Sequence, residues 1–194
     1  GKVVANCHKL PASLFDRRRV GVDEMLRGWI PLIERLSDSN PELRIMFTVS
    51  PIRHLRDGAH ENQLSKSVLL LFVDELCRMY PDRCIYFPSY EIVMDELRDY
   101  RFYDAGMTHP NEQAIRYIWE RFSEACFSEE TQTLNREWER LEKALNHRPL
   151  TPDKDAFRDF TMQNLFKLKK IWEKYSYFDL SKEIDSLELF LKTL

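Results

Sequence analysis

The fold is decided by residues 43–49, which read Leu43-Arg44-Ile45-Met46-Phe47-Thr48-Val49. This short apolar run is rich in residues that favour strands, and Ser50-Pro51 ends it, so we expect a buried strand. Apolar residues at helical spacing precede it over residues 22–36 and follow it over residues 64–79, and a second strand-like run covers residues 84–87. Two strands joined by a helix should be parallel and right-handed, which predicts an α/β class.

Polar side chains are dense directly after this strand, from Ile52 onward. Open α/β sheets bind ligands beyond the carboxyl ends of their strands, so this segment is a candidate binding site. The candidate substrate-binding residues are Ser50, Arg53, His54, Asn62 and Lys66. The guanidinium of Arg53 could fork onto a carboxylate or a phosphate, and Lys66 lies one turn after Asn62 if a helix begins near Glu61.

A metal site is the rival interpretation of the same segment. His54 and His60, with Asp57 between them, offer nitrogen and oxygen ligands. Their spacing matches no zinc pattern, and histidines beside charged residues are usually solvated or hydrogen-bonded. We therefore expect no metal ion and no cofactor.

A histidine lies where a loop meets a helix, in the stretch Tyr103-Asp104-Ala105-Gly106-Met107-Thr108-His109-Pro110. Pro110 suits the first helical position, and apolar residues at helical spacing from Ala114 to Phe122 would hold that helix against a core. Hydrolases of the α/β kind keep a general base at such a place, whereas His-Pro is also an ordinary way to begin a helix. His109 is therefore the candidate catalytic base.

Several strings that occur in one order resemble the bacterial GSCFA family, which is placed among the SGNH or GDSL hydrolases. They are residues 5–9 (Ala-Asn-Cys-His-Lys), 48–54 (Thr-Val-Ser-Pro-Ile-Arg-His), 62–66 (Asn-Gln-Leu-Ser-Lys), 86–91 (Tyr-Phe-Pro-Ser-Tyr-Glu) and 95–103 (Asp-Glu-Leu-Arg-Asp-Tyr-Arg-Phe-Tyr). The resemblance covers residues 1 to 123 and implies a partial flavodoxin-like three-layer α/β/α sandwich. It also implies a nucleophilic serine in a Gly-Ser-Cys-Phe-Ala string near the family's amino terminus.

That string is absent from this chain, and no Gly-x-Ser-x-Gly sequence occurs in it. We therefore expect a chain that is shortened at its amino terminus, lacks the first strands of the sheet and is inactive alone. Such a loss would expose an apolar sheet edge, so the chain is expected to self-associate through that edge or through its helical tail.

The resemblance also bears on the residues around the histidine. SGNH enzymes carry an acid three residues before the histidine, and here that position holds Gly106. Asp104, five residues before His109, could swing in and hold the imidazole tautomer that accepts the serine proton, or it could be a solvated loop acid. Asn6 could donate a hydrogen bond to the oxyanion, or it could be a turn residue that bonds its own backbone.

Three function classes remain open. The first is a serine ester hydrolase or acyltransferase that acts on a small-molecule or glycan ester, and it depends on the resemblance. The second is a catalytically inactive module that binds a ligand or a protein, which the missing serine and Gly106 favour. The third is a structural interaction domain, which the helical tail favours.

Composition limits the partners and the cellular location that we expect for this chain. The 194 residues carry 29 basic and 32 acidic side chains, which leaves no broad positive field for nucleic acid. The one tight basic run, residues 16–19, is expected to be a solvated turn. Four cysteines without Cys-x-x-Cys pairing predict reduced thiols and a cytoplasmic protein. No apolar stretch approaches the roughly twenty residues of a membrane span.

The chain is expected to divide near residue 128. Residues 1–128 should form the α/β domain. Three apolar patterns at helical spacing predict an all-helical extension over residues 129–194.

Overall fold

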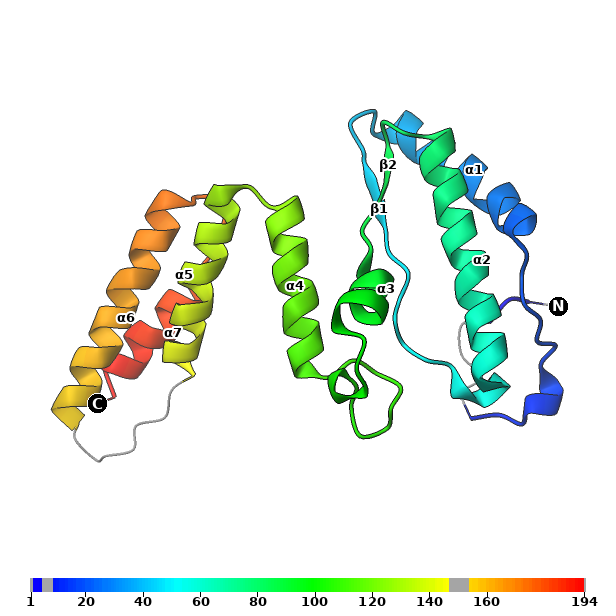
Figure 1. Ribbon diagram of the computed structural model, residues 1–194. Coiled ribbons are helices and arrows are strands. Elements are labelled where there is room, and N and C mark those ends of the chain that lie inside the picture. The colour runs from blue at the N-terminus through cyan, green and yellow to red at the C-terminus, as the bar shows by residue number, and fades with distance from the viewer. Residues whose placement is uncertain (1, 5–8, 147–153, 194) are drawn as a thin grey trace. The chain divides into compact units, whose positions relative to one another are not determined.

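The computed structural model describes residues 2–4, 9–146 and 154–193. The chain forms two compact units, Gly1–Phe122 and Ser123–Leu194. The principal elements of the first unit are α1 (Val22–Ser39), β1 (Ile45–Phe47), α2 (Gly58–Met79), β2 (Cys84–Tyr86), α3 (Ser89–Glu91) and α4 (Glu112–Cys126), the last of which runs on into the second unit (Figure 1). Short helical turns lie between them: η1 (Ala12–Leu14), η2 (Leu55–Asp57), η3 (Ile92–Leu97) and η4 (Tyr100–Phe102).

The two strands pair in parallel, with Ile45 opposite Cys84 and Phe47 opposite Tyr86. This confirms the prediction of a parallel pair joined by a helix. The side chains of these four residues all pack toward one hydrophobic core, because alternate residues of a strand point to the same face. The core itself is formed by Ile33, Val49, Phe72, Val73, Leu76 and Cys84.

Helices α1 and α2 cover this face of the sheet through aromatic contacts. The ring of Trp29 in α1 meets the ring of Phe47 edge-on at 5.4 Å, and Phe72 of α2 lies 6.4 Å from Phe47. Edge-to-face aromatic pairs stabilise a core by about 1 kcal/mol beyond the area they bury. The short strands are therefore held mainly by the two long helices.

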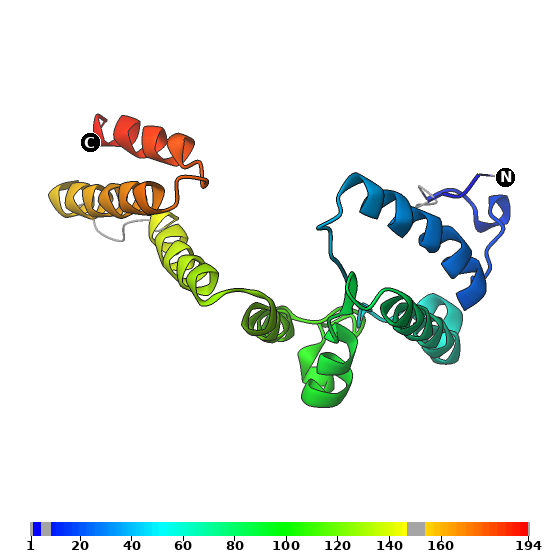
Figure 2. The same cartoon turned by 90° about the horizontal axis from the view of Figure 1, so that it is seen from above.

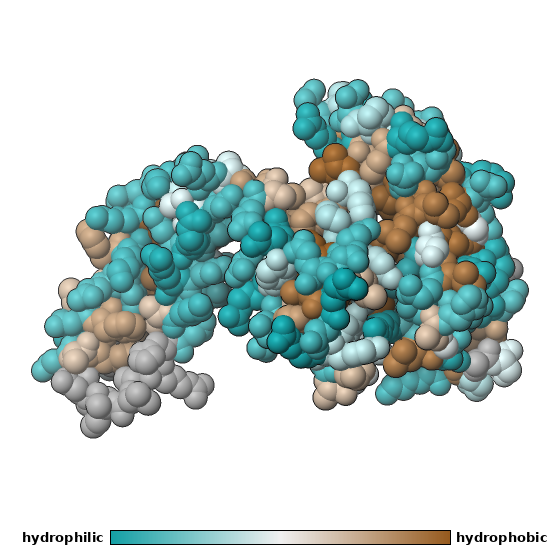
Figure 3. Space-filling view, viewed as in Figure 1, coloured by the Kyte–Doolittle hydropathy of each residue, from teal (hydrophilic) through white to brown (hydrophobic). Residues whose placement is uncertain are grey.

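The middle residues of the two strands, Met46 and Ile85, lie on the other face, where Ile85 is 42% exposed. Figure 3 shows apolar side chains at the surface of this unit among polar ones. The unit is thus mostly helical with a small two-stranded parallel sheet, and its described residues do not complete a three-layer sandwich. Self-association through an exposed edge stays a prediction.

Three helix boundaries differ from the sequence expectations. Helix α2 begins at Gly58, one turn before the expected Glu61, and Gly58 adopts a φ of 87°, which favours glycine. Helix α4 begins at Glu112, because Pro110 pairs with Tyr103 in an isolated antiparallel bridge instead of opening the helix. The expected helix over residues 90–98 is one short turn, α3, that continues as the π-helical η3.

The described residues of the second unit after α4 form the helices α5 (Glu129–Leu145), α6 (Lys154–Lys174) and α7 (Ser181–Leu191). Ser128 caps α5 by accepting a hydrogen bond from the backbone N–H of Thr131. Helices α6 and α7 lie side by side (Figure 2), and Trp138 of α5 contacts Phe178 edge-on. The buried core of this unit is formed by Leu141, Leu168, Ile171, Tyr175, Leu180 and Ile184.

Among the helices that the structure describes, none is both long enough and apolar enough to cross a membrane. Cys77, Cys84 and Cys126 are free thiols.

Candidate functional site

The loop before α4 is closed by its own backbone. The N–H of Asp104 donates to the carbonyl of His109 at 2.8 Å, and the N–H of Met107 donates to the carbonyl of Asp104 at 3.0 Å. Met107 takes a left-handed conformation with a φ of 57°, which completes this tight turn. We call residues 103–111 the histidine loop.

The last residue of this loop, Asn111, fixes it to α4. The side-chain oxygen of Asn111 accepts from the N–H of Ala114 at 3.0 Å, and its amide nitrogen donates to the carbonyl of Arg101 at 2.6 Å. Asn111 therefore caps the first turn of the helix, a role that asparagine fills well. The sequence analysis placed Pro110 at the helix start and missed this cap, although asparagine is one of the residues that commonly cap helices.

The structure brings Asp104 and His109 together. Asp104 Oδ2 lies 3.7 Å from His109 Nδ1, and Asp104 Oδ1 accepts from the N–H groups of Thr108 and His109 at 3.4 Å each. Among the described residues, Asp104 is the one polar partner of the imidazole, whose side chain is 61% exposed. The carboxylate thus lies nearest Nδ1, on a side chain that is largely exposed.

Gly106, where the resemblance leads one to expect an acid, lies against the same carboxylate. A Cβ on Gly106 would stand 3.4 Å from Asp104 Oδ1 and 3.3 Å from Thr108 Oγ1. A side chain at position 106 would therefore begin in contact with the Asp104 carboxylate.

Arg53 links the loop after β1 to the histidine loop. Its backbone N–H donates to the carbonyl of Thr108 at 3.0 Å. Its guanidinium lies over the rings of Tyr100 and Tyr103, at 4.8 and 4.7 Å from their centroids. The contact with Tyr100 raises the pKa of Arg53 further above its usual range, although burial opposes this. A planar cation that contacts two aromatic rings is a restrained group for binding an anion.

Two buried side chains hydrogen-bond to the backbone of the segment that follows β1, at Val49 and Ser50. The ammonium of Lys66, which is only 3% exposed, donates to the carbonyl of Ser50 at 2.5 Å, and the hydroxyl of Ser89 donates to the carbonyl of Val49 at 3.0 Å. Burial lowers the pKa of Lys66. Lys66 therefore supports the loop and does not present its charge to solvent, while the side chain of Ser50 is exposed and its Oγ accepts from the N–H of Ile52 at 3.2 Å.

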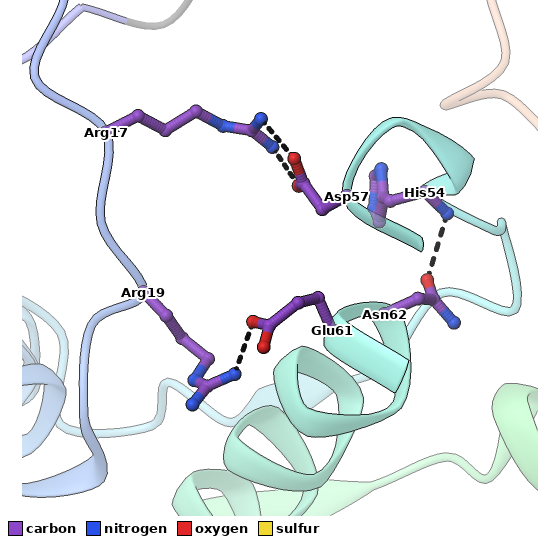
Figure 4. Close-up of polar contacts among 6 residues, drawn as sticks. All are labelled: Arg17, Arg19, His54, Asp57, Glu61 and Asn62. Atoms are coloured by element: carbon purple, nitrogen blue, oxygen red, sulfur yellow. Dashed lines mark hydrogen bonds and ion pairs between the residues drawn. The ribbon is translucent and has the colours of Figure 1, made fainter. Parts of the chain in front are cut away.

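His54 and Asn62 meet through the backbone. The side-chain oxygen of Asn62 accepts from the N–H of His54 at 2.9 Å (Figure 4), so Asn62 positions the turn before α2. The imidazole of His54 is exposed. The sequence had placed Asn62 and Lys66 on one side of the helix as ligand-binding groups, but both side chains hold the chain's own backbone.

The acids near His54 are occupied by arginines. Arg17 grips Asp57 through both carboxylate oxygens, and Arg19 Nη1 lies 2.8 Å from Glu61 Oε2 (Figure 4). The arginines of residues 16–19 are exposed, as expected for a solvated turn, and the structure adds that Arg17 and Arg19 pair with acids 40 and 42 residues away. No cluster of three potential metal ligands occurs in the part of the chain that the structure describes.

The remaining expected residue, Asn6, lies outside the described residues. Sequence reasoning missed Tyr100 and Tyr103 as partners of Arg53, and it missed Ser89 as the support of Val49. Two tyrosines three residues apart in one short turn were the available signal for an aromatic pair.

Two family models match the chain. The GSCFA family matches residues 1–122, and the GSCFA domain protein, C-terminal domain, matches residues 138–193. Comparisons with curated proteins and with solved structures find no match. Because the first model covers more than half of the chain, and its range contains both Arg53 and the Asp104–His109 pair, the chain belongs to the GSCFA family.

Proposed function

We propose that this chain belongs to a serine ester hydrolase or acyltransferase of the SGNH kind, with His109 as general base and Asp104 as the residue that orients it. The proposal is supported by the 3.7 Å approach of Asp104 Oδ2 to His109 Nδ1. A carboxylate at Nδ1 favours the tautomer whose other nitrogen, Nε2, accepts a proton. The proposal includes a three-layer sandwich for the complete domain and a cytoplasmic location.

In this reaction the hydroxyl of a serine attacks the carbonyl carbon of an ester and passes its proton to His109 Nε2. The alcohol then leaves with that proton, and water or an acceptor hydroxyl releases the acyl group from the serine. Arg53 lies beside the histidine loop and supplies a fixed cation for an anionic part of a small-molecule or glycan ester. Among the described residues no serine contacts the imidazole, so the nucleophile is left unassigned.

The proposal is tested by ester hydrolysis in the full-length polypeptide that carries this sequence. Nitrophenyl acetate turnover is measured for the wild type, His109→Ala and His60→Ala. His60 is an exposed histidine on α2 and serves as the matched control. We expect His109→Ala to lower kcat by about 10³-fold or more and His60→Ala to leave it unchanged. Equal rates in all three proteins would exclude His109 as the base.

Asp104→Asn tests the orienting role separately. The amide keeps the size of the side chain but favours the wrong tautomer, so kcat should fall on the order of 10³- to 10⁴-fold while KM changes little. An almost silent Asp104→Asn would show that Asp104 is only a loop acid.

A ligand-binding module without catalysis is the second candidate. It is favoured by Gly106 in the expected acid position and by the lack of a described serine at His109. A fluorophosphonate reagent, which labels activated serines, distinguishes the two. Labelling of one serine that is lost in His109→Ala supports the enzyme, and no labelling together with no turnover supports the binding module.

A further inference from the structure

The second unit contains a groove between α5 and α6 that the proposed ester chemistry does not use. Its volume is about 470 Å³, which lies in the range of small-molecule sites. Leu141 and Ile171 form a buried apolar floor. The charged residues that line it are Glu137 and Arg140 of α5 and Lys167, Lys170 and Lys174 of α6.

The three lysines follow one another on a single side of α6. Positions 167, 170 and 174 are separated by three and four residues, so their stems lie on one helix face over a length of about 10 Å. Within the described part of the chain, none of the four cations in the groove forms an ion pair. Lys169, one position away, does so: its Nζ lies 2.6 Å from Glu188 Oε1.

One carboxylate, that of Glu137, lines the groove with these four cations, and Tyr175, Glu137 and Glu130 raise the pKa of Lys174. The ammonium groups of Lys170 and Lys174 also lie over the aromatic rings of Phe166, at 4.6 Å, and Tyr175, at 4.8 Å. A ring occupies only one side of an ammonium group, so Lys170 keeps N–H donors for an anion.

An amide side chain also lies in this groove. Asn164 is 2% exposed and lines the groove at the end nearer the start of α6. An amide can both donate and accept hydrogen bonds, so Asn164 adds a neutral donor to the four cations. Nearby Thr161, also buried, satisfies its hydroxyl within α6 by donating to the carbonyl of Phe157 at 2.8 Å.

We propose that this groove binds an organic phosphate. The phosphate oxygens accept hydrogen bonds from the lysines, Arg140 and the amide of Asn164, and an apolar part of the ligand lies on Leu141 and Ile171. Lysine and arginine are the usual partners of phosphate, and the apolar floor favours a small molecule over a bare ion. The proposal is independent of His109, which lies in the other unit.

Calorimetric titration of the 194-residue chain with inorganic phosphate and with phenyl phosphate tests the proposal. We expect one site per chain and tighter binding of phenyl phosphate than of inorganic phosphate, because only the former covers the apolar floor. Asn164→Leu keeps the side chain's size and should weaken binding about tenfold or more, since a hydrogen bond to a charged group is lost.

A double variant, Lys167→Gln with Lys170→Gln, keeps the test valid if Asn164→Leu does not fold. Both lysine side chains are exposed, so their replacement should not disturb the fold. We expect the double variant to weaken binding about tenfold, and we expect the control Lys169→Gln to leave binding unchanged. Equal weakening by Lys169→Gln, or no effect of either groove variant, would overturn the proposal. So would binding of a polyglutamate peptide or citrate in preference to both phosphates, since that would show a site for carboxylates.

Discussion

Replacing Ser89 by alanine should loosen the edge of the sheet from which the candidate site projects. The hydroxyl of Ser89 donates to the carbonyl of Val49 at 3.0 Å, and these residues are only 8% and 2% exposed. Val49 lies beyond the end of β1, so its carbonyl has no partner in the strand ladder. Leaving a buried carbonyl unpaired costs about 1–3 kcal/mol.

Hydrogen exchange at one amide measures this cost without interference from the second unit. The N–H of Phe87 donates to the carbonyl of Phe47 at 2.9 Å, so its exchange rate reports the opening of the sheet. A loss of 1–3 kcal/mol corresponds to exchange that is about 5 to 150 times faster in Ser89→Ala.

Ser67→Ala is the matched control. Ser67 also donates to a backbone carbonyl, that of Gln63 at 2.9 Å, but it is exposed on α2. Surface substitutions of this kind change the free energy of unfolding by no more than about 0.5 kcal/mol. If exchange at Phe87 were the same in Ser89→Ala and Ser67→Ala, the reasoning that Ser89 holds the loop after β1 would be refuted.

Three further predictions concern the same unit. Because burial lowers the pKa of Lys66, the folded state binds fewer protons than the unfolded state as pH approaches the ordinary value of 10.5. The free energy of unfolding of the wild type should therefore rise relative to Lys66→Met between pH 7 and pH 10.5, and a constant difference in urea titrations would contradict this. Met107→Gly should raise the unfolding free energy by about 1 kcal/mol, since it relieves a left-handed residue, and a lower melting temperature would oppose it. Arg53→Lys should lower the unfolding free energy by about 1 kcal/mol, because lysine lacks the planar guanidinium that lies over both tyrosine rings; an unchanged urea midpoint would mean that these ring contacts contribute nothing.

The sequence predicted the parts of the fold that depend on local pattern. The apolar runs around residues 45 and 84 became the parallel strands, and the intervening apolar periodicity became α2. Helix starts were less certain, because proline and asparagine both favour them. Pro110 pairs with Tyr103, so the helix begins after Asn111. That pairing depends on how the loop closes, which the local sequence does not show.

The sequence could nominate individual residues for the candidate site, but it could not predict most of the contacts that those residues make. Asp104 and His109 are five residues apart, so their meeting was open to sequence reasoning. Arg53 meets Tyr100 and Tyr103 only because separate segments of the first unit converge. Likewise, the buried position of Lys66 follows from how α2 packs below the loop after β1, which no local spacing reveals.

The geometry of the histidine loop explains how an acid can lie at position 104 when the family resemblance points to position 106. A side chain on Gly106 would begin 3.4 Å from Asp104 Oδ1 and 3.3 Å from Thr108 Oγ1, so residues 104 and 106 lie in contact within one tight turn. An acid at both positions would bring like charges together, which is unfavourable, whereas an acid at either one leaves a single carboxylate near Nδ1. Among the described residues Asp104 alone supplies this carboxylate, so Asp104→Asn tests the whole contribution of an acid at His109.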